Sequence, residues 1–511
     1  MKFTSPLGIF FLLFLVPGIA QGWQTKTEDL PNIVIILADD MGFGDVRALN
    51  PKSKIATPNL DRLHEEGCTF LDAHSPSAVC TPTRYSLLTG RYSWRTPMKR
   101  GVLNGYSKPM LEPDRVTIAT KLKAAGYQTG IVGKWHLGME MPMKQNDADV
   151  PQFKGDPGID FAGQITDSPI HHGFDYYFGV SASLDMAPYV YIRNDRFTAL
   201  PTVQQPAVKF PHFVRRGPRA EDFVIDECLN RLVDESTAFI RDKSADNESP
   251  YFLYVPFTAP HKPTQPNDKF RGTTELGPYG DFIAQVDDAV GQILTAVRAG
   301  SAGNNRKTML VFTSDNGSYM HRYDQPRKDH VDDTNVQGFR AENHQANGPW
   351  RGTKADIYEA GHRVPFFVYW PGTVPAGSVA RQTVCHVDLF ATCADIIGQP
   401  LTDNEAEDSF SILKMAEGDK TATRPVPVIH QAISGMLAIR DGDWKMIAGN
   451  GSGGREKPAG KMDEGPFMLF NLQTDPGETN DLAEQHPDVL KKLTDKLAKI
   501  RHHEKGSRFV E

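Results

Sequence analysis

The feature that most constrains the fold of this chain is an alternation of short apolar runs with segments of helical periodicity. Residues 32–37 (NIVIIL) form a continuous apolar run, which is typical of a strand. Residues 58–66 then predict a helix, with Thr57 as its N-cap, Pro58 in its first position and Gly67 at its end. Strands that alternate with helices favour a parallel or mixed sheet covered by helices on both faces.

The alternation continues along the chain and then gives way to a segment of different character. We expect further elements over residues 117–125 (helix), 128–132 (strand), 251–257 (strand), 280–297 (helix), 307–313 (strand) and 364–370 (strand). Residues 140–215, rich in Pro, Gly, Asp and Tyr, predict a long insertion near one end of the sheet. After about residue 402, a hairpin over 438–447 with an Asp-Gly turn and an amphipathic helix over 487–502 predict a smaller subdomain.

These patterns predict the fold class and the domain boundaries. The fold class is α/β, with a large mixed, mostly parallel sheet sandwiched by helices. With 511 residues, of which 39% are hydrophobic, the chain is long enough for up to about three domain-sized units. We expect a signal peptide over residues 1–22, a main domain over 27–402, and an α+β C-terminal subdomain with an antiparallel sheet and a terminal helix over 403–511.

The N-terminus predicts export of the protein. Lys2 supplies a positive charge, residues 8–20 form an apolar stretch too short to span a bilayer, and Gly18-Ile19-Ala20 is typical of a cleavage site. We expect a cleaved signal, a secreted or periplasmic protein (lysosomal if the source is eukaryotic) and no stable membrane anchor. An uncleaved anchor is the alternative.

Charge and cysteine content narrow the classes of function. The 56 Lys and Arg residues against 63 Asp and Glu residues give a net charge of −7, which argues against a nucleic-acid partner but allows a local cationic pocket.

The five cysteines are an odd number, so at least one is unpaired in a monomer. Cys385 and Cys393 fall in a segment that reads as helical, where about 12 Å would separate them, too far for a disulfide. Cys80 is the cysteine of interest, because it lies in a polar, Pro-rich stretch predicted to be a loop.

Polar side chains follow four of the predicted strands. Asp39 and Asp40 follow strand 32–37, and Lys134 and His136 follow strand 128–132. His261 follows strand 251–257, and Asp315, Asn316 and Gly317 follow strand 307–313. Ligands of open α/β sheets bind outside the carboxyl ends of the strands, so these clusters converge if the strands are parallel. Three carboxylates and one amide oxygen are hard ligands that suit Ca²⁺ or Mg²⁺ better than zinc. Either acidic pair by itself is equally typical of a cap or a turn.

The most specific motif is CTPTR at residues 80–84, which continues as YSLLTGR over residues 85–91. It resembles the signature of the type I sulfatases in the alkaline phosphatase superfamily, which is Cys-x-Pro-Ser-Arg followed by a Thr-Gly-Arg tail. One departure is that Thr83 stands where Ser is usual. Further blocks similar to the family lie at residues 39–42 (DDMG), 133–138 (GKWHLG), 259–261 (APH), 314–317 (SDNG), 351–365 (RGTK to GHRVP) and 469–478 (LFNL and DPGE). Ala360 stands where a second Gly is common.

The resemblance implies an arylsulfatase-like catalytic domain over residues 27–402 and a set of site residues. It implies that a formylglycine-generating enzyme oxidises Cys80 to formylglycine, whose hydrate is the nucleophile. It implies one bound Ca²⁺, with the metal-binding residues Asp39, Asp40, Cys80, Asp315 and Asn316. The catalytic residues that it implies are Cys80, Arg84, Lys134, His136, His261 and Lys354.

The resemblance also implies a role for each of these residues. Arg84 steadies the hydrate and the metal-site carboxylates, while Lys134 and Lys354 hold the sulfate oxygens. His136 takes a proton from the hydrate, and His261 protonates the leaving alkoxide. An ordinary surface lysine, or a histidine bonded to backbone, is the plain alternative, and it applies most to His261 because its motif is the shortest.

The function expected from these observations is hydrolysis of sulfate monoesters, with sulfated saccharides as substrate. The Asp-Asn pair at residues 315–316 separates this chain from two-zinc phosphatases of the same superfold, which carry Asp-His there. Phosphate or phosphonate monoester hydrolysis is the alternative within the superfamily. A sulfated-glycan binding protein without turnover is the alternative from another class, although a binder has no need of Cys80.

Overall fold

The computed structural model describes Met1 and residues 30–144, 153–209, 212–246, 248–319, 343–503 and 505–510. The predicted signal peptide over residues 1–22 therefore lies outside the described residues, apart from Met1. Within the described part of the chain, no helix has both the length and the apolar character that crossing a bilayer requires.

A ten-stranded mixed sheet forms the centre of the molecule, in the order β13-β2-β12-β11-β1-β10-β4-β5-β6-β7. These strands are β1 (Asn32–Asp39), β2 (Cys68–Phe70), β4 (Gln128–Lys134), β5 (Tyr176–Val180), β6 (Ile192–Arg193), β7 (Arg196–Phe197), β10 (Tyr251–Pro260), β11 (Thr308–Ser314), β12 (Phe366–Tyr369) and β13 (Ser378–Ala380). The five central strands, β11-β1-β10-β4-β5, are parallel to one another. The predicted fold class is confirmed.

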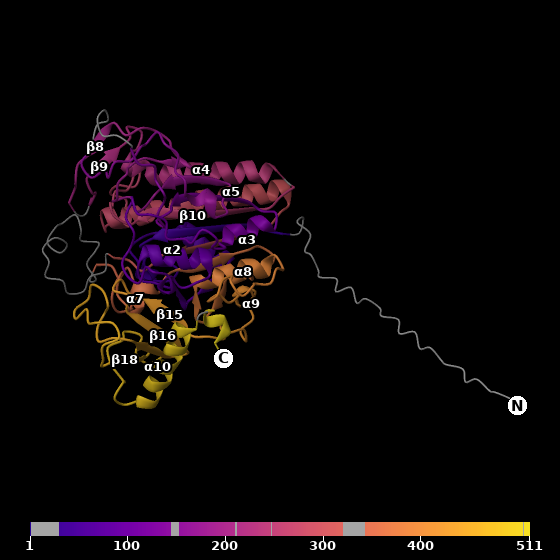
Figure 1. The fold of residues 1–511 in the computed structure, drawn as a ribbon, viewed down its shortest axis with the longest axis vertical. Helices are drawn as coiled ribbons and strands as arrows, with labels where there is room; N and C mark the ends of the chain where they lie inside the picture. The colour runs from indigo at the N-terminus through magenta and orange to yellow at the C-terminus, as the bar shows by residue number, and fades with distance from the viewer. Residues whose placement is uncertain are drawn as a thin grey trace.

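Helices cover both faces of this sheet (Figure 1). On one face lie α1 (Pro58–Glu66), α4 (Cys228–Ala245) and α5 (Pro278–Asn304), and on the other lie α2 (Cys80–Thr89), α3 (Ile118–Ala124) and α8 (Leu389–Ile396). All residues of β1 and β11 are buried, as expected for strands covered on both sides. The apolar stripe predicted within 280–297 is the buried face of α5.

A second, four-stranded antiparallel sheet lies near the C-terminus, in the order β15-β16-β17-β18. It consists of β15 (Val428–Gln431), β16 (Leu437–Asp441), β17 (Trp444–Ile447) and β18 (Met468–Asn471), and α10 (Pro487–His502) packs against β16 and β17. The predicted hairpin and terminal helix are thereby confirmed.

Backbone hydrogen bonds join β15 and the residues just after it to the segments that hold Cys80 and Lys354. The backbone N–H of Ala78 donates to Gln431 O at 2.8 Å, and the N–H of Ile433 donates to Ala355 O at 3.1 Å. Ala78 lies just before Cys80, and Ala355 lies just after Lys354. The C-terminal sheet therefore fixes the backbone beside two of the predicted catalytic residues.

Three local expectations are wrong. Residues 140–215 are not only an insertion, because β5 within them extends the central sheet parallel to β4. Cys80 is not in a loop but is the first residue of α2, where Pro82 fits because the first helical turn needs no N–H donor from it. Cys385 is in a short strand, β14 (Val384–Cys385), rather than in the helix that holds Cys393, and all five cysteines are free and buried.

Candidate active site

The polar clusters that follow the strands meet in one buried site at the carboxyl edge of the sheet. Asp39 and Lys134 are the last residues of β1 and β4, His261 directly follows β10, and Asp315 directly follows β11. These four strands are parallel neighbours, so their ends lie side by side. The structure also brings Cys80, Arg84 and Lys354 to this edge.

Cys80 lies at the N-terminus of α2, inside this site. Its Sγ is 3.7 Å from Asp39 Oδ1 and 3.4 Å from Lys354 Nζ. The Thr83 hydroxyl donates to the carbonyl of Ser77 at 2.9 Å, an interaction that Ser would also make. Burial raises the pKa of the Cys80 thiol to about 12, although Lys134 and Lys354 act in the opposite direction. An unmodified thiol here stays protonated at neutral pH and is a weak nucleophile.

Arg84 joins the helix to the strand ends. Its Nη2 and Nε donate to Asp315 Oδ2 at 2.7 and 3.1 Å, and its Nη1 donates to Lys134 O at 3.1 Å. The guanidinium is fully buried. Arg84 therefore fixes the orientation of Asp315 and places a positive charge among the carboxylates, as a positioning residue does.

Two lysines contact the acidic residues of the site, one at the end of β4 and one on the loop before α7. Lys134 Nζ donates to Asp39 Oδ2 at 2.7 Å, and Lys354 Nζ donates to Asp40 Oδ1 at 2.5 Å. Burial lowers the pKa of Lys354, but the charge of Asp40 raises it further, so the net shift is upward. Both ammonium groups carry three donors each, which leaves N–H groups for an oxyanion beside Cys80.

The two predicted histidines are neutral and buried. His136 Nε2 donates to Leu103 O at 2.9 Å, and its Nδ1 has no hydrogen-bond partner among the described residues. His261 Nδ1 donates to Lys262 O at 2.6 Å, and its Nε2 lies 3.6 Å from Asp40 Oδ2. Burial is the largest cause that holds the pKa of each histidine well below its usual range, followed by the charges of Lys134 and Arg84 at His136 and of Lys354 and Lys134 at His261. Each therefore has a free nitrogen able to accept a proton.

The acidic residues of the site fit a bound cation. Asp40 Oδ2 and Asn316 Oδ1 are buried and have no hydrogen-bond partner in the described part of the chain. Ligand atoms of Asp39, Asp40, Cys80 and His261 lie within 4.8 Å of one another. Two orphaned oxygens beside two further buried carboxylates form an oxygen-rich donor set, which suits a hard cation.

Sequence analysis did not place two charged residues that border this site, Arg215 and Lys262, which lie beside Asp185. Asp185 Oδ1 lies 3.8 Å from His261 Nδ1, and Arg215 holds the other oxygen of the same carboxylate. Lys262 is partly buried beside them, and burial lowers its pKa to about 8. Lys262 directly follows His261 at a strand end, so its position could have marked it. No pattern marked Arg215, because its partner lies on a separate loop.

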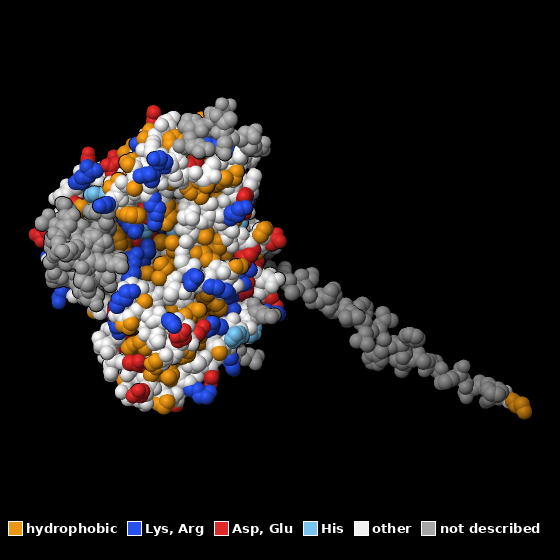
Figure 2. All heavy atoms as spheres, turned by 60° about the vertical axis from the view of Figure 1, so that its left-hand side comes forward, with side chains coloured by type: hydrophobic (Ala, Val, Ile, Leu, Met, Phe, Trp, Pro, Cys, Tyr) orange, Lys and Arg blue, Asp and Glu red, His pale blue; other side chains and the backbone are white. Residues whose placement is uncertain are grey.

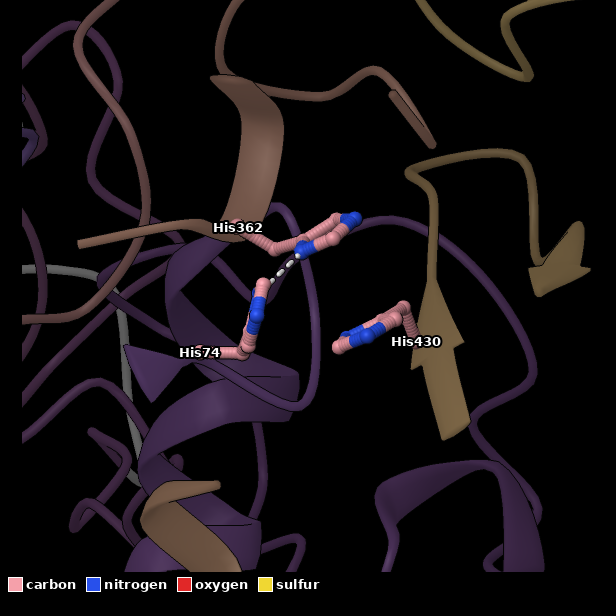
Figure 3. A group of neighbouring side chains, drawn as sticks. All are labelled: His74, His362 and His430. Carbon is pink, nitrogen blue, oxygen red and sulfur yellow. Dashed lines mark hydrogen bonds between the residues drawn. The ribbon is translucent and has the colours of Figure 1, made fainter. Parts of the chain in front are cut away.

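A second group of buried histidines lies away from this site. His74, His362 and His430 come from β3 (Ala73–His74), α7 (Glu359–His362) and β15, and they face one another (Figure 3). His74 Nδ1 lies 3.0 Å from His362 Nδ1, and the rings of His362 and His430 stack 3.8 Å apart at 8°. Parallel rings direct their lone pairs into parallel planes rather than to one point, and Lys445 Nζ lies 3.2 Å from His362 Nε2. The group is therefore a packed structural cluster and not a metal centre.

The fold and the site define an α/β protein in which a buried cysteine lies beside two lysines and a group of carboxylates, an arrangement that suits an oxyanion substrate. The sulfatase family model matches residues 31–399. An N-acetylgalactosamine-6-O-sulfatase of Bacteroides thetaiotaomicron is 33% identical, over 96% of this chain and 98% of that protein. Human arylsulfatase A is 30% identical, over 94% of this chain and 89% of its own length. This chain belongs to the sulfatase family and is a sulfuric ester hydrolase.

The same relationship is seen in three dimensions. A solved structure from work on glycosaminoglycan metabolism by Bacteroides thetaiotaomicron superposes with a TM-score of 0.79 at 30% sequence identity. The match covers 93% of this chain and 100% of that structure. The likeness extends over both the central sheet and the C-terminal sheet.

Proposed function

We propose that this protein removes sulfate from sulfated saccharides, with residue 80 as the nucleophile. The observation that carries the proposal is the position of Cys80 Sγ, 3.4 Å from Lys354 Nζ and 3.7 Å from Asp39 Oδ1. A sulfate monoester is an anion, and it requires donors around its oxygens next to the attacking atom. Lys134 and Lys354 supply such donors on either side of Cys80.

The nucleophile is proposed to be a formylglycine made from Cys80. A buried thiol that stays protonated is poorly suited to attack, and sulfur would hold the product as a stable adduct. As its hydrate, formylglycine supplies one hydroxyl for attack on the sulfate sulfur and a second whose deprotonation releases sulfate. Maturation therefore requires a formylglycine-generating enzyme as a partner.

One Ca²⁺ is proposed as the cofactor, held by Asp39, Asp40, Asp315, Asn316 and residue 80. The support is the hard, oxygen-rich donor set with its two orphaned oxygens. A bound Ca²⁺ supplies Lewis-acid polarisation of the nucleophile and of a sulfate oxygen. Arg84 keeps Asp315 in place for this role through its two hydrogen bonds.

The remaining steps are proton transfers that the site histidines can perform. His136 has an unpartnered Nδ1 and accepts a proton from the nucleophile side. His261 is proposed to take up a proton at Nε2 once an anionic sulfate ester offsets the charges of the two site lysines, and to deliver that proton to the leaving oxygen of the saccharide. Asp185, 3.8 Å from His261 Nδ1, balances the charge that His261 carries before it gives up that proton.

N-acetylgalactosamine 6-sulfate is the first saccharide to test, because the bacterial relative acts on that sugar by name. The protein is proposed to be exported, through the signal peptide expected over residues 1–22. Export would bring the enzyme to sulfated polysaccharides outside the cytoplasm.

The experiment that tests the proposal combines a peptide mass with a rate comparison. Protein co-expressed with a formylglycine-generating enzyme should yield a peptide across residue 80 that is lighter by the thiol-to-aldehyde change and reacts with hydrazides. The same protein should hydrolyse sulfate esters faster than phosphate esters of one phenol, and should release sulfate from N-acetylgalactosamine 6-sulfate. A converted protein that prefers the phosphate ester, or an active protein with an alkylatable thiol at Cys80, would refute it.

A further inference from the structure

A cationic cavity of about 500 Å³ lies apart from the active site, between the segment after α2 and the end of α10. Its wall includes Arg91, Trp94, Arg95, Lys99, Arg501 and His503. None of the described residues that line it is Asp or Glu. Lys and Arg side chains also gather in a column along the middle of one face of the molecule (Figure 2). The protein is acidic overall, so such local concentrations of positive charge require an explanation.

Carboxylates outside the wall hold the three arginines in place. The pairs are Arg91 with Glu407 at 3.4 Å, Arg95 with Asp408 at 2.8 Å, and Arg501 with Asp463 at 2.8 Å. Arg95 also donates to the carbonyls of Ile500 and His503, which ties the end of α10 to this wall. The guanidinium groups are therefore preorganised rather than freely mobile.

Lys99 adds a charge that no carboxylate balances. Its Nζ donates to the carbonyl of Trp94 at 2.6 Å, and no Asp or Glu in the described part of the chain pairs with it. Partial burial lowers the pKa of Lys99, and the charges of Arg91, Arg501 and Arg95 lower it further. A group repelled by three neighbouring cations is stabilised when an anion enters.

Two ring nitrogens of the same wall are without partners. Trp94 Nε1 and His503 Nδ1 are buried and have no hydrogen-bond partner among the described residues. The Trp94 ring stacks on Tyr92 at 18°, and the Arg95 guanidinium lies 4.4 Å from the Trp94 ring centroid. The wall thus combines fixed cations with a rigid aromatic ring.

The cavity is close to the active site along the chain. The carbonyl of Lys99 accepts from Gln431 Nε2 at 2.7 Å, and the carbonyl of Leu103 accepts from His136 in the active site. Lys99 and Leu103 are four positions apart in the chain, a span of at most about 14 Å. An extended ligand with regularly spaced anionic groups can therefore reach both places.

We propose that this cavity is a second anion-binding site, which holds a sulfate or carboxylate group of an acidic oligosaccharide while another sugar of that chain occupies the active site. The identity of the ligand rests on the proposed function, whereas binding of an oxyanion does not require turnover. The cavity would make the enzyme prefer oligosaccharides over single sulfated sugars.

The test measures binding by isothermal titration with full-length Cys80→Ser protein, in which turnover is blocked. The probes are a chondroitin 6-sulfate hexasaccharide, N-acetylgalactosamine 6-sulfate and inorganic sulfate. Lys99→Ala and Arg501→Ala should each weaken hexasaccharide binding at least fivefold and reduce its salt dependence, with monosaccharide binding unchanged. Lys491→Ala, at a side chain of α10 that is 76% exposed and lies outside the cavity wall, should behave as the parent.

Each outcome decides the proposal. Equal hexasaccharide affinity in the parent and both variants overturns it. If the variants lose binding of inorganic sulfate but keep the full affinity for the hexasaccharide, the cavity is an oxyanion site, and the proposal that its ligand belongs to a saccharide is overturned. Turnover of an aryl sulfate by converted protein, measured separately, reports on the proposed function alone, and the Lys99→Ala variant should retain the parent rate. Failure of that reaction in every protein would refute the proposed function without touching the binding comparison.

Discussion

Lys134 Nζ lies 2.7 Å from Asp39 Oδ2, and neither side chain is exposed to solvent. The two residues end β4 and β1, which have β10 between them, so this ion pair reaches across the top of a strand. The ion pair contributes to the stability of the sheet as well as to the site, because either charge buried without its partner would be unfavourable.

Replacing Lys134 should therefore affect both activity and stability. Lys134→Ala should lower kcat/KM for an aryl sulfate by about 10² to 10³, because it removes a donor to the reacting group. It should also lower the free energy of unfolding by about 3 to 5 kcal/mol, because Asp39 loses its partner. Steady-state rates and urea unfolding measure the two effects. Lys134→Arg keeps the charge and should retain most of the stability with reduced activity; equal loss of stability in both variants would argue against the ion pair.

Removal of the proposed Ca²⁺ should destabilise the protein as well as inactivate it. After dialysis against a calcium chelator, the midpoint of thermal unfolding should fall, and added Ca²⁺ should restore it. A free concentration one hundred times the Kd contributes about 2.7 kcal/mol. Asn316→Leu removes one proposed ligand oxygen and should shift the calcium titration to higher concentrations. A melting temperature independent of calcium in the parent would show that no cation is held by the site.

Gly133 should not tolerate a side chain. Its φ is +142°, and a Cβ there would lie 1.9 Å from Pro256 O on the neighbouring strand. Gly133→Ala should push β4 away from β10 and displace Lys134, with a loss of several kcal/mol in stability. The matched control is Gly303→Ala at the end of α5, where a Cβ meets nothing within 4 Å. That change should be neutral or slightly stabilising. Soluble expression and urea unfolding of the two variants give the comparison.

The histidine cluster of Figure 3 should make stability depend on pH. Burial first, and then neighbouring cations, hold the pKa values of His362 and His430 well below the usual 6.5. The unfolded chain takes up protons below pH 6.5 and the folded chain does not, so this contribution is present above pH 6.5 and is lost as the pH falls. The loss is about 1.4 kcal/mol per pH unit for each histidine. The charged and titratable groups that face the pair are Asp72, His74, Glu359, Arg363, Arg440, Lys445 and Glu478.

The variant His430→Gln isolates one histidine of this cluster. Glutamine does not titrate, so the variant should lose stability less steeply than the parent between pH 6.5 and 5. Urea unfolding at several pH values gives both slopes. Parallel slopes for parent and variant would mean that His430 does not contribute to the acid sensitivity.

The sequence predicted those parts of the fold that depend on local periodicity. The bounds of α1 and α10 agree with the prediction because each helix has one buried and one exposed face. The sequence of helix α2 gave no such signal, because all ten of its residues are buried and the helix has no exposed polar face opposite a buried apolar one. The polar residues that follow the strands were found from the strand pattern, and the structure brings them together because four parallel strands end at one edge. Cys80, Arg84 and Lys354 were found only by the resemblance to a family.

Contacts between residues far apart in the chain could not be predicted from the hydrophobic pattern of the sequence. The hydrogen bond from Ile433 to Ala355 depends on how the C-terminal sheet docks, and nothing in the local sequence encodes that docking. The approach of Asp185 to His261 is set in the same way, by a loop packed against the end of β10. Such contacts follow from tertiary packing, which periodicity does not report.

The position of Cys80 at the buried start of α2 also limits the time during protein synthesis in which its side chain is accessible. In the folded protein Cys80 is 2% exposed, so the enzyme proposed to convert it to formylglycine would have to reach it while the chain is still open. Ser77, just before it, is held by the carbonyl of Gln431, which is 354 residues further along the chain. At about 5 to 20 residues per second, that partner emerges roughly 20 to 70 s after Cys80. The late synthesis of the C-terminal sheet thus keeps the cysteine within reach for most of the time that the chain takes to be made.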